Sequence, residues 1–297
     1  MGAFRNAACT LLLLALASCQ CGAPCASQLD CGAGQVCSSG TCVGVAAGGS
    51  GGSGGSGGTG GSGGSGDGGR AGGSANAGGS NTNNPDGGPC IPQIVATVRD
   101  FQASHADFED FLGSKKGIVQ TRLGADKKPV YGPEPASAPV VTSTQANFDQ
   151  WYRDVAGTNQ KFMVPLALTE PSPRRFVYDN PNFFPVDGQG FGNEGNNHNF
   201  HFTTEIHGEF TYEGGESFTF RGDDDVWVFV NGRLALDLGG VHGAESGTID
   251  FDAQAATLGI SRNNKYPLDV FHAERHTTES NFRIETTIGC LTPITIN

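Results

Sequence analysis

Three adjacent carboxylates, Asp223, Asp224 and Asp225, are the residues of this sequence whose types and spacing most suggest chemistry. They directly precede an apolar run at residues 226–230, so they stand at the end of a predicted buried strand. Like charges on successive residues repel, and such a strand end suits them poorly unless a cation or hydrogen-bond donors compensate. Because successive strand residues point to opposite faces, one ion collects neighbouring carboxylates only where the backbone turns, bulges or adopts an unusual peptide.

A tight hairpin is predicted directly after the aspartates. The apolar runs 226–230 and 234–238 flank Asn231-Gly232, a dipeptide that favours a two-residue turn with positive φ at both positions. Apolar residues fall on both faces of the first run, so we expect a central strand that other layers cover from both sides. A glycine-rich stretch at 239–243, which contains His242, follows the second run.

Periodicity predicts the remaining elements. Ser104 and Asp107 have the spacing of a capping box for a short helix. A second helix is expected from Thr144, and the aromatic stripe that repeats along it at helical spacing indicates core packing rather than a binding platform. Strands are predicted at residues 95–98, 201–212, 247–251, 267–272 and 281–288, and a long irregular connection at 170–199.

The strand at 201–212 alternates apolar residues with polar ones, which predicts a half-buried strand. We interpret its polar face as solvated, because mixed charged residues are what an exposed face carries. A surface metal site is the competing interpretation, since alternate strand residues share a face. Its ligands would be His201, Glu205, His207 and Glu209.

Around the aspartates the sequence resembles the fibro-slime domain, a branch of the PA14-like family of extracellular modules. The resemblance extends over nearly all of residues 91–288. The matched stretches are RDF, HADFE, FDQWYRDV, HNFHFTTE, GDDDVWVFVNG, LDLGGVHG and FHAERH. It implies a mostly β fold, a PA14-like β-sandwich or barrel with one or two short peripheral helices.

The resemblance also implies a binding site. In lectin-type members two consecutive aspartates, here Asp223 and Asp224, are joined by a cis peptide and hold Ca²⁺, and the ion holds sugar hydroxyls. With the strands paired as in the family, Glu274 and Asn281 are candidates to join them around the ion, with Asp225 beside them. His242 and Arg275 are then expected to contact the ligand.

A structural role for the same residues is the alternative. Glu274, Arg275 and the aspartates would then form a buried network of salt bridges and hydrogen bonds that only fixes a loop.

The first residues predict export and a lipid anchor. Residues 1–18 combine Arg5 with a leucine-rich run that is too short to span a membrane, as in a secretory signal. The sequence Leu16-Ala17-Ser18-Cys19 is similar to a bacterial lipobox, which predicts a signal peptide at 1–18 and a covalent lipid on Cys19. An ordinary cleavage site, with Cys19 as a disulfide cysteine, is the alternative. Gln20, directly after Cys19, resembles the pattern of bacterial lipoproteins that are transported to the outer membrane. We therefore expect a cell-envelope lipoprotein exposed at the surface, or a secreted protein.

The nine cysteines fit an oxidising compartment. A lipidated cysteine-rich stub is predicted at 19–45, with two disulfides of open connectivity and Cys21 left over; a zinc site is the competing interpretation. The four cysteines concerned are Cys25, Cys31, Cys37 and Cys42. A flexible Gly/Ser-rich linker is predicted at 46–88 and the β domain at 89–297, which a Cys90–Cys290 disulfide would close.

Composition excludes several functions. The formal net charge of −12, without a basic patch, argues against nucleic acid, and no nucleotide loop, nucleophile motif or HExxH is present. We therefore expect a surface-anchored adhesion protein, not an enzyme, that binds an extracellular glycan or matrix polysaccharide with calcium. A structural or protein-binding module for envelope or matrix proteins is the main alternative. An enzyme acting on polysaccharide is a weaker one, because no carboxylate pair across a cleft is evident.

Overall fold

The structure, a computed structural model, describes residues 35–38, 41–44, 93–132, 139–294 and 296. The signal peptide, Cys19, Cys25, Cys31 and the linker lie outside the described residues, so the statements about them stay predictions. In the unit Met1–Gly66, β1 (Gln35–Ser38) and β2 (Thr41–Gly44) form an antiparallel hairpin. No helix among the described residues is long and apolar enough for a membrane span.

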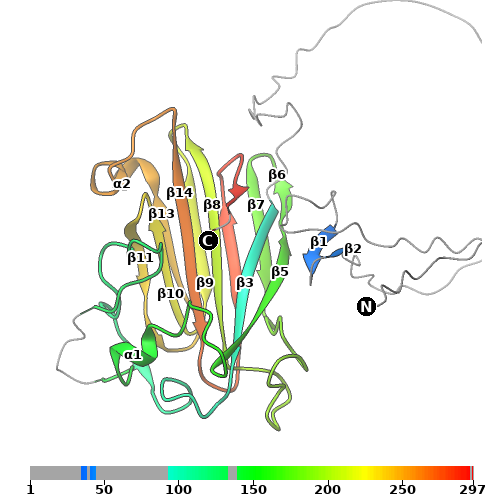
Figure 1. The fold of residues 1–297 in the computed structure, drawn as a ribbon. Helices are drawn as coiled ribbons and strands as arrows, with labels where there is room; N and C mark the ends of the chain where they lie inside the picture. The colour runs from blue at the N-terminus through cyan, green and yellow to red at the C-terminus, as the bar shows by residue number, and fades with distance from the viewer. Residues whose placement is uncertain (1–34, 39–40, 45–92, 133–138, 295, 297) are drawn as a thin grey trace, which may run out of the picture. The chain divides into compact units, whose positions relative to one another are not determined.

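The unit that follows is built mainly from two large antiparallel sheets (Figure 1), and β4 (Gly113–Ser114) and β12 (Gly240–Val241) form a third sheet of two short strands. The larger sheet has the order β11 (Arg233–Leu238), β10 (Asp225–Val230), β14 (Asn264–Glu274), β8 (Phe202–Tyr212), β3 (Gln93–Phe101), β5 (Asn159–Ala167), with β16 (Thr292–Pro293) beside β8. The other has the order β13 (Glu245–Asp250), β9 (Ser217–Gly222), β15 (Phe282–Thr286), β7 (Arg175–Asn180), β6 (Thr169–Ser172). Both sheets are open, so the predicted mostly β, PA14-like fold is confirmed as a sandwich and not a barrel.

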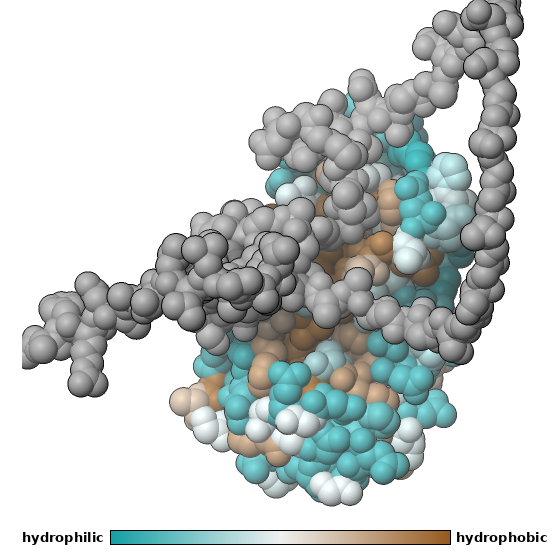
Figure 2. Space-filling view, turned by 90° about the vertical axis from the view of Figure 1, so that its right-hand side faces the viewer, coloured by the Kyte–Doolittle hydropathy of each residue, from teal (hydrophilic) through white to brown (hydrophobic). Residues whose placement is uncertain are grey.

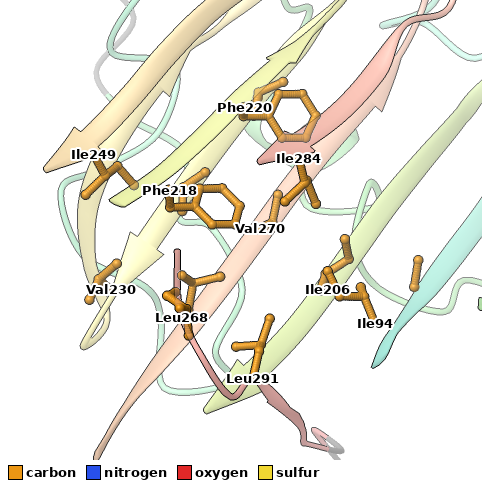
Figure 3. Close-up of a cluster of buried hydrophobic side chains, with 14 of the residues drawn as sticks. Ile94, Ile206, Phe218, Phe220, Val230, Ile249, Leu268, Val270, Ile284 and Leu291 are labelled. Carbon is orange, nitrogen blue, oxygen red and sulfur yellow. The ribbon is translucent and has the colours of Figure 1, made fainter. Parts of the chain in front are cut away.

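The main core lies between the two sheets (Figure 3). Phe218, Phe220 and Ile284 of one sheet face Ile206 and Val270 of the other, and all five are buried. Each such side chain contributes about 1.5–3 kcal/mol when it leaves water. Seen from the edge that carries β5, β6 and β7, apolar residues form a band between two hydrophilic areas (Figure 2).

A second apolar cluster covers the opposite face of the larger sheet. Trp227 and Phe271 of the sheet pack against Phe148, Trp151 and Tyr152, which belong to the segment between β3 and β5. The predicted aromatic stripe is therefore core, as expected. It starts from α1 (Gln145–Phe148), where the Thr144 hydroxyl accepts a hydrogen bond from the Asn147 amide as an N-cap. The first strand of the hairpin is thus covered from both sides, as the sequence indicated.

The hairpin itself follows the prediction. Strands β10 and β11 pair antiparallel around Asn231 and Gly232, whose φ angles are 53° and 66°. Both angles are positive, as a two-residue turn of this type requires.

Two local predictions are wrong. Residues 103–110 form turns and bends, not a helix, because the Asp107 carboxylate accepts hydrogen bonds from the Ser143 amide and the Trp151 indole instead of capping a helix. The connection predicted as irregular contains most of β6 and all of β7. Pro171 is tolerated there because β6 is an edge strand.

The helix α2 (Phe251–Leu258) was not predicted. The Asp250 side chain caps its N-terminus.

The polar face of β8 is also not solvated, contrary to the prediction. His201, Thr203, Glu205 and His207 are all buried, because the segment between β3 and β5 lies over them. The surface metal site receives no support either, since His201 hydrogen-bonds with Glu109 and Glu194 while His207 contacts a different pair of carboxylates.

His207 stands between two acids. Its Nδ1 lies 2.6 Å from the Asp269 carboxylate, and its Nε2 contacts Glu205, which also pairs with Arg99 and Lys128. Burial opposes a charge on the imidazole, but the hydrogen bonds with Asp269 and Glu205 outweigh it and raise the pKa of His207. Burial likewise opposes the charge on Glu205, but its hydrogen bond with His207 and the nearby positive charges lower its pKa to about 2.

The substitution His207→Gln is expected to lower stability but to flatten its decline above about pH 6.5. A histidine with a raised folded-state pKa contributes fully below its unfolded pKa of about 6.5 and loses this contribution as pH rises through the folded value. Glu205 does not interfere, because its contribution disappears only as pH falls from about 4.5 toward 2. Thermal unfolding between pH 5.5 and 9, with His198→Gln as the exposed control, measures the slopes. Parallel slopes for His207→Gln and the unmodified chain would refute this role.

Candidate functional site

The three aspartates occupy the crossing from one sheet to the other. Strand β9 ends at Gly222 and β10 begins at Asp225, so Asp223 and Asp224 form the connection. The peptide bond between Asp223 and Asp224 is cis, as the family resemblance implied. All three carboxylates are buried.

Each carboxylate is held by a different part of the chain. Asp223 accepts hydrogen bonds from the backbone and side-chain nitrogens of Asn281, the latter at 2.9 Å. Asp224 accepts from the backbone nitrogens of His242 and Arg275, both at 3.1 Å. Asp223 and Asp224 therefore receive only neutral donors.

Asp225 differs because it forms an ion pair. Its Oδ2 lies 2.6 Å from Arg275 Nε, and neither side chain is exposed. The Arg275 Nη1 donates to the carbonyl oxygens of Asp107 and Val141, and its guanidinium lies 4.8 Å from the Trp151 ring centre. Asp225 and Arg275 therefore form a structural pair beneath the pocket and do not line it.

Gly240 connects the ion pair to a short two-stranded sheet. It belongs to β12 (Gly240–Val241), which pairs with β4 (Gly113–Ser114), and its amide donates to Asp225 Oδ1 at 2.6 Å. Its φ is 105°, and a Cβ atom would lie 2.3 Å from the Gly113 carbonyl oxygen. Only glycine fits this position without displacing β4.

Glu274 is the carboxylate without compensation. It is 1% exposed, and neither of its oxygens has a well-formed hydrogen bond among the described residues, so that only weak interactions with the Ser280 side chain and the His276 backbone favour its charge. Burial, together with the charges of Asp224 and Asp223, raises the pKa of Glu274 well above its usual range. A buried polar group without a partner is costly, so this position requires a proton or a cation.

Burial also shifts two neighbours. It raises the pKa of Asp224 to about 7, against the opposing effect of Arg275. Burial lowers the pKa of His272 to about 4, so its imidazole is neutral and Nε2–H donates to the Asp223 carbonyl oxygen at 2.7 Å. The region is thus acidic and buried, and the charge of Arg275 is paired with Asp225.

A pocket of about 420 Å³ opens above Asp223 and Asp224. The rest of its lining comes from three segments: Leu112 before β4, residues 241–243 at the end of β12, and the loop 276–279. Thr278 has a φ of 143°, unusual for a β-branched residue, and such conformations cluster at ligand sites. The pocket volume is within the range of small-molecule sites.

The structure brings together most of the expected site residues. Asp223, Asp224 and His242 line the pocket, and Asn281 hydrogen-bonds with Asp223. Glu274 lies close enough for the charges of the two aspartates to raise its pKa. The sequence did not reveal Leu112 or Val241 as lining residues, since a two-residue strand leaves no periodicity. Thr277, Thr278 and Glu279 carried a weak signal, the density of polar groups between the last two predicted strands.

Within the described residues, no three His, Cys, Asp or Glu side chains already converge as metal ligands. The donor chemistry nevertheless fits a hard cation, because every candidate ligand is an oxygen and Glu274 has two uncompensated ones. Metal binding stays a prediction.

Residues 177–295 match the family model of the PA14 domain. The chain contains a PA14 domain. The match includes all three aspartates, Glu274 and Asn281, and it confirms the resemblance to the PA14-like family that the sequence showed.

The chain is similar to psi proteins of Dictyostelium discoideum. It is 40% identical to protein psiD over 218 residues, which cover 68% of this chain and 42% of psiD. It is 40% identical to protein psiQ over 196 residues, which cover 61% of this chain and 19% of psiQ. The chain therefore spans less than half the length of these curated relatives.

Solved PA14 domains show a weak structural likeness. The PA14 sugar-binding domain from an RTX adhesin is 10% identical with a TM-score of 0.30, over 68% of this chain and 94% of that one. The PA14 domain of the MpAFP antifreeze protein is 9% identical with a TM-score of 0.27, over 43% and 79%. Likeness at this level supports no argument about the site.

The substitution Arg275→Met is expected to lower the free energy of unfolding by about 3–5 kcal/mol, because it leaves the Asp225 charge buried without its partner. It also removes the donors to Asp107 and Val141. Denaturant unfolding measures the loss, and the matched control is Arg174→Met, whose ion pair with Glu213 is exposed and should matter little. A comparable loss in both variants would show that Arg275 is no special support.

Proposed function

We propose that the PA14 domain is an extracellular carbohydrate-binding module that uses Ca²⁺ at Asp223 and Asp224. The PA14 family is known for carbohydrate binding and adhesion, and the calcium dependence is what we add for this chain. The observation that carries the proposal is Glu274, a buried carboxylate that lies beside two further acids and whose oxygens have no well-formed hydrogen bond among the described residues.

The ligands of the ion would be oxygens of Asp223, Asp224 and Glu274, beside Asn281, whose Nδ2 donates to Asp223. Asp223 is already oriented by two hydrogen bonds from Asn281, and Asp224 by two backbone amides. Each carboxylate oxygen that accepts one hydrogen bond retains acceptor capacity for a cation. Ca²⁺ held by these residues would supply further coordination positions for oxygen ligands such as sugar hydroxyls.

The chain's own residues have distinct roles in this arrangement. Asp225 and Arg275 support the floor through their ion pair and do not take part in binding. The His242 ring lies near the carbonyl oxygens of Gly243 and Leu238, so it forms part of the wall. The loop 276–279 forms the other side of the pocket. We regard the domain as a binding module and not as an enzyme.

Surface display is a further part of the proposal. A lipid on Cys19 would anchor the chain to the outer membrane, and the linker at 46–88 would let the PA14 domain reach a glycan or matrix polysaccharide. The expected disulfide between Cys90 and Cys290 would close the domain; Cys290 is disulfide-bonded, and Cys90 lies outside the described residues.

A structural module that docks on envelope or matrix proteins is the second candidate. The Asp225–Arg275 pair supports it, because in that part of the cluster the two charges compensate each other without any ion, although Arg275 Nη2 is buried without a hydrogen-bond partner among the described residues. It leaves Glu274 unexplained, and for this reason we place it second.

Calcium titration of the chain by calorimetry tests the site. We expect about one ion per chain, and Asp224→Asn or Glu274→Gln should weaken binding by more than about tenfold, since each removes a charged ligand. Asp187→Asn is the matched control, because Asp187 pairs with His198 outside the pocket. Unchanged calcium affinity in both site variants would exclude these ligands.

Thermal melting separates the two candidates. With an ion site, Glu274→Gln should be at least as stable as the unmodified chain in chelator, because it replaces an acid buried without a partner by a neutral amide. It should then gain much less from added Ca²⁺. In the structural alternative, calcium changes neither melting temperature. Binding to immobilised glycans with and without chelator completes the test.

A further inference from the structure

Leu112 is a solvent-exposed apolar side chain at the rim of the pocket. It is 66% exposed, the largest exposure among the large hydrophobic residues that the structure describes. It lines the same pocket as Asp223 and Asp224. An exposed leucine alone needs no explanation, but one beside a buried acidic cluster adds an apolar surface to an otherwise polar site.

The backbone around Leu112 is fixed, so its position is built into the fold. The next residue, Gly113, pairs with Val241 in the β4–β12 ladder, which places Leu112 alongside His242. The Lys115 amide donates to the Gly239 carbonyl oxygen at 2.6 Å, and the Ser114 hydroxyl donates to Glu245 at 2.9 Å. Leu112 is thus presented by a held strand, and a ligand that covers it gains from removing apolar surface from water.

The charges of the pocket restrict what covers Leu112. The lining carries three acids, Asp223, Asp224 and Glu279, and contains no lysine or arginine. The nearby Arg275 has no exposure and is paired with Asp225. An acidic ligand would therefore meet an excess of negative charge that a single divalent ion does not offset.

We infer that the pocket takes a neutral sugar that carries a methyl group, with the methyl against Leu112 and hydroxyls toward the aspartates. The inference rests on the proposed function and adds the ligand class and a specificity-determining residue. The methyl group belongs either to a 6-deoxy sugar or to an acetylated amino sugar. Both offer the same apolar contact without charge.

A matched series of sugars tests this. For one ring configuration, the 6-deoxyhexose, the parent hexose and the hexuronic acid differ only at C6, and the N-acetylhexosamine supplies the second source of a methyl group. In calcium buffer we expect at least one methyl-bearing sugar to bind about 4- to 10-fold more tightly than the hexose. The uronic acid should bind most weakly, and the preferred methyl-bearing sugar identifies the source.

Leu112→Ser should reduce the methyl preference to within about twofold while leaving calcium affinity unchanged. Val140→Ser is the matched control, since Val140 is 54% exposed and lies outside the pocket lining. A methyl preference that survives in Leu112→Ser, or tighter binding of the uronic acid, overturns the inference. If the hexose binds with calcium but no methyl-bearing sugar binds better, only this inference fails. If no sugar binds, the proposed function fails with it.

Discussion

The buried pair of Asp225 and Arg275 is the interaction on which the rest of the site depends. It joins the start of β10 to the end of β14, and the same guanidinium donates to the carbonyl oxygens of Asp107 and Val141 in the covering segment. A pair without exposure is tolerated only when each charge is compensated. Because Asp225 also accepts from the Gly240 amide, one guanidinium positions the sheet, its cover and the wall of the pocket.

Only Asp225 forms an ion pair among the clustered acids, and the charge of Arg275 compensates Asp224 only in part, which divides the acidic cluster into two parts. Asp223 and Asp224 receive only neutral donors, and Glu274 has no well-formed hydrogen bond among the described residues. The structural network expected as an alternative is therefore present in Asp225 and Arg275. It does not extend to Glu274 and Asp224, because hydrogen bonds from neutral donors do not offset the cost of charging these buried carboxylates, and burial raises the pKa of both.

The sequence predicted those parts of the fold that local chemistry decides. Asn231-Gly232 fixed the hairpin by its positive φ angles, and the aromatic stripe after Thr144 marked core. The burial of the polar face of β8 could not be predicted, since the segment that covers it comes from far away in the sequence. The failed capping box has the same cause: Asp107 bonds with Ser143 and Trp151, and tertiary contacts overrode a local signal.

The candidate site divides in the same way. Asp223, Asp224, Glu274 and Asn281 lie at or next to strand ends, and their grouping was an implication of the family resemblance that antiparallel pairing, which brings such ends together, now explains. Leu112 reaches the pocket through a ladder of two residues per strand, which has no sequence signature. The acids are held by the sheets and by Arg275, whereas the rim is held by short loops. Loop changes at the rim would therefore alter which ligand is chosen without disturbing the carboxylates below.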